Sequence, residues 1–224
     1  MRWWHYLHFF IYHAWYWNIP LAWFVLEHEI RGEHRYGIRT TQIIPPSKIA
    51  ATLQQKLHAE AYHPLNYYIA EQLFQHLPQG ITHGTFLDIG CGQGRLLCMA
   101  AHYGFKQVIG IELDAHCCLT ANKNASITQQ QFPDCTFDVI HGDASVYSIP
   151  TAVQVISLFN PFDDILMQCC IDNVLESLAQ HPRKIWILYA SPLYEQLWLQ
   201  AGFRIEHTFS KHRYLQASIL TNHY

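Results

Sequence analysis

The sequence has little charge and no long basic run. Only 14% of its 224 residues are Asp, Glu, Lys or Arg, and the net charge is −3. A chain of this composition has no bulk positive field to hold nucleic acid by its phosphates. Half of the residues are hydrophobic, which excludes a largely disordered chain and allows one domain with a full core plus an appendage.

The chain also lacks the cysteine patterns of disulfide or zinc frameworks. It has seven Cys, an odd number, and no C-x-x-C pair, only the adjacent pairs Cys117-Cys118 and Cys169-Cys170. This favours reduced thiols and a cytoplasmic location. His5, His8 and His13 could be interpreted as a metal cluster, but without Cys or acid partners we expect the polar edge of a helix and no metal site.

Residues 3–26 contain no Asp, Glu, Lys or Arg and are rich in Trp, Tyr and Phe. Their spacing predicts an imperfect amphipathic helix with Leu7 and Ile11 on its apolar side. Three interpretations stay open: docking on a membrane surface or a protein partner, packing on the chain's own domain, and a membrane span interrupted by Asn18 and Pro20. A signal peptide is disfavoured by the single positive charge and the lack of a clear cleavage site.

Residues 27–48 are polar and contain Gly32, Gly37 and Pro45-Pro46, which predicts an irregular linker. We therefore expect an N-terminal aromatic helix and linker over residues 1–47 and a second domain over residues 48–224. That domain begins with helical patterns at 48–59 and 65–77.

An apolar run with an acid at Asp88 leads into three alternating glycines, Gly90, Gly92 and Gly94, and then into an apolar helical stretch. This predicts a strand, a tight turn and a helix whose free N–H groups form an anion site. A ligand carboxylate is the expected anion, since no P-loop Lys-Ser/Thr pair follows. Arg95 stands where the dinucleotide fingerprint needs a third glycine.

Downstream, apolar runs alternate with helical patterns, which predicts a parallel sheet covered on both faces. The expected strands are 108–111, 137–141, 153–159 and 185–189, the helices 95–103, 115–131, 163–180 and 193–200, and the closing hairpin 203–209 with 214–220.

Four successive strands end in polar residues, Asp88, Glu112, Asp143 and Asn160. Ligands of parallel sheets bind at the carboxyl ends of the strands, so we expect these side chains to share one site. Glu112 could accept from both hydroxyls of a ribose, or act as a helix cap. Asp143 could accept from an adenine amino group, or be an ordinary turn residue.

Asn160-Pro161-Phe162 follows the fourth strand. The Asn amide oxygen and a neighbouring main-chain carbonyl could both accept from one amino group, while Phe162 offers a ring face to the substrate or to a cation. The alternative is a proline-containing turn into the next helix.

Residues from about 60 to 220 resemble class I S-adenosylmethionine (SAM) methyltransferases, and Asp88–Gly94 matches their motif I. The resemblance implies a three-layer Rossmann-like α/β sheet of seven mostly parallel strands with a C-terminal hairpin and N-terminal helices. It also implies SAM as cofactor and assigns the residues that bind it and act on the acceptor. The implied cofactor-binding residues are Asp88, Gly90, Cys91, Gly92, Gly94, Glu112, Asp143 and Ala144, and the implied catalytic residues are Asn160, Pro161 and Phe162.

Asn160-Pro161-Phe162 is similar to the Asp/Asn-Pro-Pro-Tyr/Phe motif of amino-group methyltransferases but lacks the second Pro. The chain more closely resembles a bacterial branch with Phe-Asn-Pro-Phe, and its motif I region is distantly similar to that of lysine methyltransferases. The other motifs shared with that branch are Tyr62-His63-Pro64, Tyr189-Ala190-Ser191-Pro192 and, loosely, Arg35–Thr40.

We therefore expect methyl transfer from SAM to a nitrogen, with a protein or small-molecule acceptor favoured over nucleic acid and protein lysine as a candidate. Phe162, Tyr62 and Tyr189 would form an aromatic pocket around the amine. Two alternatives remain: a SAM-sensing or scaffold protein with a degenerate substrate site, and an NAD-dependent oxidoreductase, which Arg95 and Asp88 disfavour.

Overall fold

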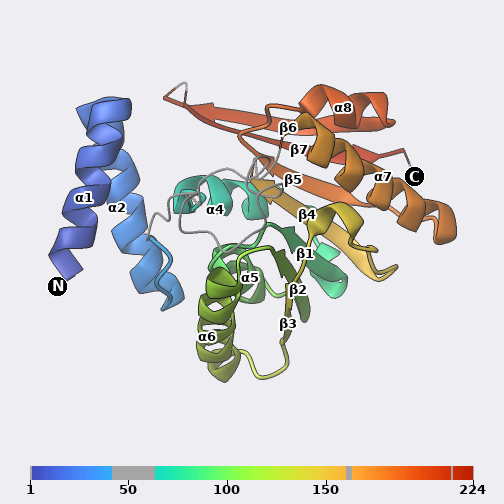
Figure 1. Cartoon of the computed structure of the whole chain (residues 1–224), viewed down its shortest axis with the longest axis horizontal. Coiled ribbons are helices and arrows are strands. Elements are labelled where there is room, and N and C mark those ends of the chain that lie inside the picture. Colours follow the sequence, from blue (N-terminus) through green and yellow to red (C-terminus); the bar gives the residue numbers. More distant parts are fainter. Residues whose placement is uncertain (1, 42–63, 160–162, 213, 224) are drawn as a thin grey trace.

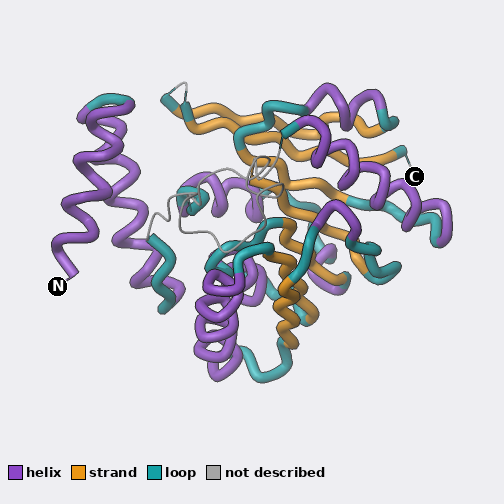
Figure 2. The backbone as a smooth tube through the Cα atoms, in the orientation of Figure 1, coloured by secondary structure: helices purple, strands orange, loops and turns teal. Residues whose placement is uncertain are grey.

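The computed structural model describes residues 2–41, 64–159, 163–212 and 214–223. A central seven-stranded sheet in the order β3-β2-β1-β4-β5-β7-β6 carries helices on both faces (Figures 1 and 2). The first five strands are parallel, and β7 and β6 close the sheet as an antiparallel hairpin. Their bounds are β1 Thr85–Ile89, β2 Gln107–Glu112, β3 Thr136–His141, β4 Val153–Phe159, β5 Trp186–Ala190, β6 Phe203–Lys211 and β7 Leu215–Asn222. The expected fold class is confirmed.

The central strands are buried on both faces, because successive side chains point into two separate cores. Phe86 belongs to the core shared with α4 and α5, whereas Leu87 belongs to the core shared with α7 and α8. This explains why these strands are continuous apolar runs without polar alternation. The helices around them are α4 Tyr67–Gln75, α5 Arg95–His102, α6 Ala115–Gln131, α7 Asp164–Gln180 and α8 Glu195–Gln200, with short 3₁₀ turns at η2 Ile81–His83 and η3 Ala144–Val146.

Two helices, α1 (Arg2–Tyr16) and α2 (Ile19–Tyr36), precede the sheet and lie side by side (Figure 1). Asn18, expected to interrupt a helix, instead begins the second one: its side chain accepts from the Leu21 N–H at 2.9 Å. Pro20 lies in the first turn of α2, where a missing N–H costs no hydrogen bond.

The prediction that residues 27–48 form an irregular linker is wrong over 27–36, which are helical. The buried side of α2 follows the helical repeat through Leu21, Ala22, Val25, Glu29, Gly32 and Tyr36. Gly32 is a packing position, since a Cβ there would lie 2.2 Å from Cγ of Tyr67. The glycine therefore permits close approach of a ring and does not break the helix.

The predicted apolar side of α1 is wrong at two positions. Leu7 and Ile11 are 47% and 55% exposed, whereas Phe9 and His13, whose tilted rings lie 4.1 Å apart between centroids, are buried. Contact with α2 selects this face, which the spacing of apolar residues alone does not. One face of α1 thus packs on α2.

Several expectations fall on residues outside the described part of the chain. These are the helix at 48–59, the domain boundary at 47/48, and Tyr62 and His63. In the described ranges, no helix combines the length and apolar character needed to cross a membrane.

Candidate active site

The glycine turn after β1 requires left-handed backbone at all three of its glycines. Their φ angles are +76° at Gly90, +52° at Gly92 and +80° at Gly94, a region that side-chain-bearing residues rarely adopt. The N–H groups of Gly90 and Cys91 donate to the Ile111 carbonyl at 2.9 and 3.0 Å. The turn is thereby fixed to the end of β2, which brings motif I next to Glu112.

Helix α5 begins at this turn without a side-chain cap. Gly94 is its N-cap residue, and a Cβ there would lie 3.0 Å from the Cβ of Ala121 on α6. The uncapped first turn directs N–H groups toward the carboxyl edge of the sheet. That arrangement suits a carboxylate ligand, because helix N-termini favour negative charge.

Glu112, at the end of β2, faces the turn from the other side. Its carboxylate accepts from the Gly92 N–H at 2.8 Å and from the Asp114 N–H at 2.9 Å. Burial raises the pKa of Glu112, and these two hydrogen bonds oppose that shift. A carboxylate held in this way beside the glycines can also accept from hydroxyl groups of a ligand.

Asp88 is almost completely buried at the end of β1, where its carboxyl group accepts from the Ser157 hydroxyl of neighbouring β4. Burial raises its pKa to about 7, the Ser157 hydrogen bond opposes that shift, and the charge of Glu112 adds to it. A carboxyl group titrating near neutrality beside a second acid is typical of functional sites.

Asp143 is a cap residue in this structure. Its carboxylate accepts from the Ser145 N–H at 2.9 Å and from the Ser145 hydroxyl at 2.7 Å, beginning η3. The adjacent Ala144 carbonyl accepts from Asn173 at 3.3 Å. The turn role therefore has direct geometric support, while adenine recognition by Asp143 and Ala144 stays a prediction.

Asn160, Pro161 and Phe162 lie outside the described residues. Tyr189 does not fit the predicted aromatic pocket: it is fully buried in the core shared with α7 and α8, and its hydroxyl accepts from the Tyr194 N–H at 3.2 Å. Neighbouring side chains of a strand point to opposite faces of the sheet, so Ala190 lies in the core shared with α4 and α5 and Tyr189 in the core shared with α7 and α8. Ser191, next in the motif, has a φ of +49°, which marks strained backbone at the carboxyl end of β5.

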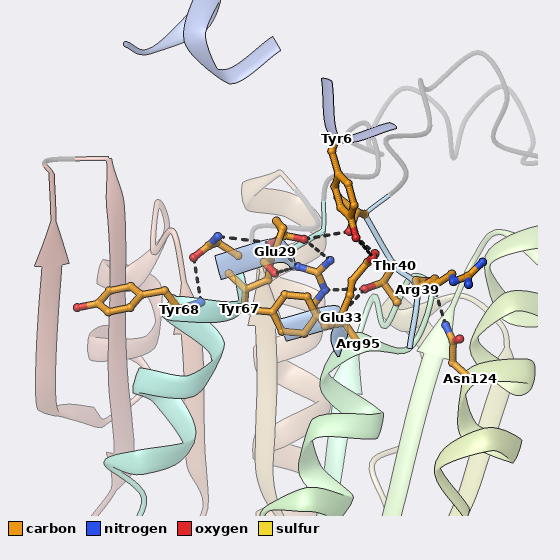
Figure 3. A network of polar contacts seen from close by, with 12 residues as sticks. Tyr6, Glu29, Glu33, Arg39, Thr40, Tyr67, Tyr68, Arg95 and Asn124 are labelled. Atoms are coloured by element: carbon orange, nitrogen blue, oxygen red, sulfur yellow. Dashed lines mark hydrogen bonds and ion pairs between the residues drawn. The ribbon is translucent and has the colours of Figure 1, made fainter. Parts of the chain in front are cut away.

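Sequence reasoning missed a buried ion pair beside the glycine turn. Arg95, the first residue of α5, pairs with Glu29 of α2 (Figure 3). The available signals were an acid within the apolar repeat of α2 and an arginine at the start of an apolar helix. A charge at a core position requires a partner, but nothing in the sequence joins residues this far apart.

For metals, the described ranges contain no group of three or more His, Cys, Asp or Glu placed to hold an ion. His13 was expected on the polar edge of the first helix. It is buried instead, and its Nδ1 lies 2.8 Å from the Phe9 carbonyl oxygen.

The chain is similar to methyltransferases in sequence and in fold. A family model described as a methyltransferase domain matches residues 86–181. Ribosomal protein L11 methyltransferase of Agathobacter rectalis is 35% identical over 57 residues, which are 25% of this chain and 18% of that protein. The protein of the same name from Vibrio campbellii is 28% identical over 124 residues, 50% of this chain and 41% of that protein.

Among solved structures, ribosomal protein L11 methylase from Lactobacillus delbrueckii subsp. bulgaricus matches with a TM-score of 0.53 and 16% identity, covering 70% of this chain and 81% of that one. This likeness concerns the fold. The matches to the curated relatives span less than half of their length.

Proposed function

We propose that this protein transfers the SAM methyl group to an amino nitrogen of a protein acceptor, because residues 86–181 match a methyltransferase domain and the sheet has the fold of a solved methylase. The observation that supports this most directly is the meeting of the glycine turn and Glu112 at the carboxyl edge of the sheet.

The described residues suit SAM. The left-handed glycines and the uncapped start of α5 offer N–H groups to the carboxylate of the methionine part, and Glu112 offers acceptors to the ribose hydroxyls. In the proposal, Cys91 forms part of the turn and Asp88 stabilises the turn from the end of β1. Asp143 and Ala144 lie beside the adenine.

SAM supplies a methyl group on a positively charged sulfur, which departs with the bonding electron pair as neutral S-adenosylhomocysteine. The protein must hold the acceptor nitrogen so that its lone pair points at that methyl group. We assign this to Asn160 and to the Pro161 carbonyl, which would accept from the N–H groups of the amine, with Phe162 shielding it from water.

A protein acceptor is favoured by the relatives named for ribosomal protein L11. A lysine amine has a free pKa of about 10.4 and attacks only after losing its proton. A desolvated site lowers that value, because burial disfavours the charged form. Tyr189 is too deeply buried to contribute, so Phe162 and Tyr62 remain the aromatic candidates.

We also propose that the N-terminal helices dock on a membrane surface. Trp4, Trp15 and Trp23 are 74%, 85% and 64% exposed, on a stretch free of charged residues from 3 to 26. Tryptophan at this density favours the lipid–water interface. The protein should sediment with phosphatidylcholine vesicles. A Trp4→Ser/Trp15→Ser variant should bind the vesicles less, while the control Val146→Ser should bind them as well as the unsubstituted protein. Equal sedimentation of all three would contradict the proposal and favour a protein partner.

The catalytic proposal is tested in two steps. S-adenosylhomocysteine should raise the melting temperature while NAD should not, because a ligand that binds only the folded state stabilises it. Labelled SAM should then mark protein in a lysate, on an amino nitrogen. Ligand binding without any labelled product would instead support a SAM sensor, and label on oxygen or carbon would refute the amino acceptor.

Asn160→Ala should lower turnover by roughly 10²-fold, the scale of losing one positioned polar group, with unchanged cofactor affinity. Normal turnover in this variant would remove Asn160 from the mechanism.

A further inference from the structure

Arg95 directly follows the glycine turn, and hydrogen bonds from three nitrogens of its side chain fix its position. Its Nη2 donates to Glu29 at 2.7 Å and its Nη1 at 2.8 Å, a two-pronged contact. Nη1 also donates to the Leu65 carbonyl, and Nε donates to the Thr40 hydroxyl at 2.7 Å. A planar guanidinium bound in this way has one fixed orientation.

Glu29 has no access to solvent. The exposed fractions of the two side chains are 0% for Glu29 and 4% for Arg95. Thr41 and Asn66 donate further hydrogen bonds to the same carboxylate, at 3.2 and 3.4 Å. A carboxylate buried this completely would strongly destabilise the fold without a charged partner, and Arg95 is that partner.

The packing around the pair joins α2 to the glycine turn (Figure 3). The Arg95 guanidinium lies 3.9 Å from the ring centroid of Tyr67, and Gly32 of α2 makes room for that ring. Asn124 of α6 donates to the Gln93 carbonyl at 2.9 Å and to the Arg39 carbonyl at 3.4 Å. The segment after α2 is therefore linked to the turn on both sides of Gly94, directly through Thr40 and Arg95 and indirectly through Asn124.

We propose that Glu29 and Arg95 are positioning residues, which make the N-terminal helices part of the cofactor site by holding the turn at Gln93–Arg95 in its ligand-binding shape. The inference rests on the proposed function, because it assigns SAM to this turn.

The physical reason lies in the backbone. Arg95 is the first helical residue after Gly94, so its main chain belongs to the helix start that faces the ligand. Gly94 has no side chain to restrict it, and its left-handed conformation is one of several open to glycine. Anchoring the adjacent side chain to α2 removes that freedom before the ligand binds, and pre-organisation of this kind increases affinity.

The test compares two matched substitutions, Arg95→Lys and Arg183→Lys. Arg183 is also buried and is held by the Val153, Ser177 and His181 carbonyls, but it precedes β5 at the opposite edge of the sheet. Lysine keeps the charge in both variants and loses the planar set of donors that a guanidinium provides.

Calorimetry with S-adenosylhomocysteine and urea unfolding should be measured on both variants. Arg95→Lys should weaken binding roughly 10- to 100-fold, the range of one hydrogen bond to a charged group. Arg183→Lys should lower the urea midpoint and leave binding unchanged. Equal affinity in the Arg95→Lys and unsubstituted proteins, or an equal loss in Arg183→Lys, would overturn the inference.

The double variant Glu29→Met/Arg95→Met separates positioning from stability. Replacing a buried ion pair by apolar side chains often preserves stability, but it does not restore a fixed orientation. We expect a folded protein with a persistent loss of affinity. A double variant with the stability and the S-adenosylhomocysteine affinity of the unsubstituted protein would show that the pair is purely structural. Absence of binding by the unsubstituted protein would instead refute the proposed function.

Discussion

The buried carboxyl group of Asp88 should make the protein less stable as the pH rises. Its folded-state pKa of about 7 lies above the ordinary value of 3.8, so the folded state binds the proton more tightly than the unfolded chain does. The resulting stabilisation is complete below the unfolded pKa and is lost as the pH rises toward 7.

The magnitude follows from the shift. One pKa unit corresponds to about 1.4 kcal/mol, so a shift of about three units lowers the stability, relative to its value at low pH, by roughly 4 kcal/mol above pH 7 and by roughly 2 kcal/mol at pH 5. Asp88→Asn removes the ionisation while keeping the shape. The variant should therefore be more stable than the unsubstituted protein by about 4 kcal/mol at pH 8 and by about half of that at pH 5.

Urea unfolding without cofactor at pH 5 and pH 8 measures this directly. Asp134→Asn is the control, because that side chain is 85% exposed and its ion pair with Lys106 is long, at 3.9 Å; its effect on stability should stay within about 0.5 kcal/mol. A stability difference for Asp88→Asn that is the same at both pH values would show that Asp88 ionises normally. Ser157→Ala should act in the opposite direction at pH 8, because Asp88 loses its hydrogen-bond donor.

Three further predictions concern the turn and the N-terminal helices. Gly94→Ala should destabilise the fold by about 1–2 kcal/mol in urea, since alanine disfavours a φ of +80°, and an unchanged midpoint would contradict this. Glu112→Ala should weaken S-adenosylhomocysteine binding in calorimetry, because the ribose acceptor and the partner of the Gly92 N–H are both lost; unchanged binding would remove the ribose assignment. A chain that begins at Gly37 should lose its cooperative melting transition by circular dichroism, because Arg95 would be left buried without Glu29, whereas a native melting curve would mean that the helices are detachable.

The sequence alone determined the sheet. Continuous apolar runs alternating with helical repeats predict parallel strands covered on both faces, as in β1 to β5, and the three alternating glycines specify a turn that other residues cannot adopt easily. These are local or periodic signals, so the strands and the turn were predictable. The position of Glu112 beside the turn followed from the same rule, because the carboxyl ends of neighbouring parallel strands lie at one edge.

Only the tertiary structure decided what the N-terminal residues do. From the sequence, Gly32 predicts a break in the helix, whereas in the fold it lets the Tyr67 ring pack against α2. The buried face of α1 is determined by its contact with α2. The pairing of Glu29 with Arg95 joins residues 66 positions apart, and each of the two is unremarkable in its own segment. Such contacts depend on the packing of whole elements, and neither local propensity nor periodicity encodes which distant charge will fill a buried position.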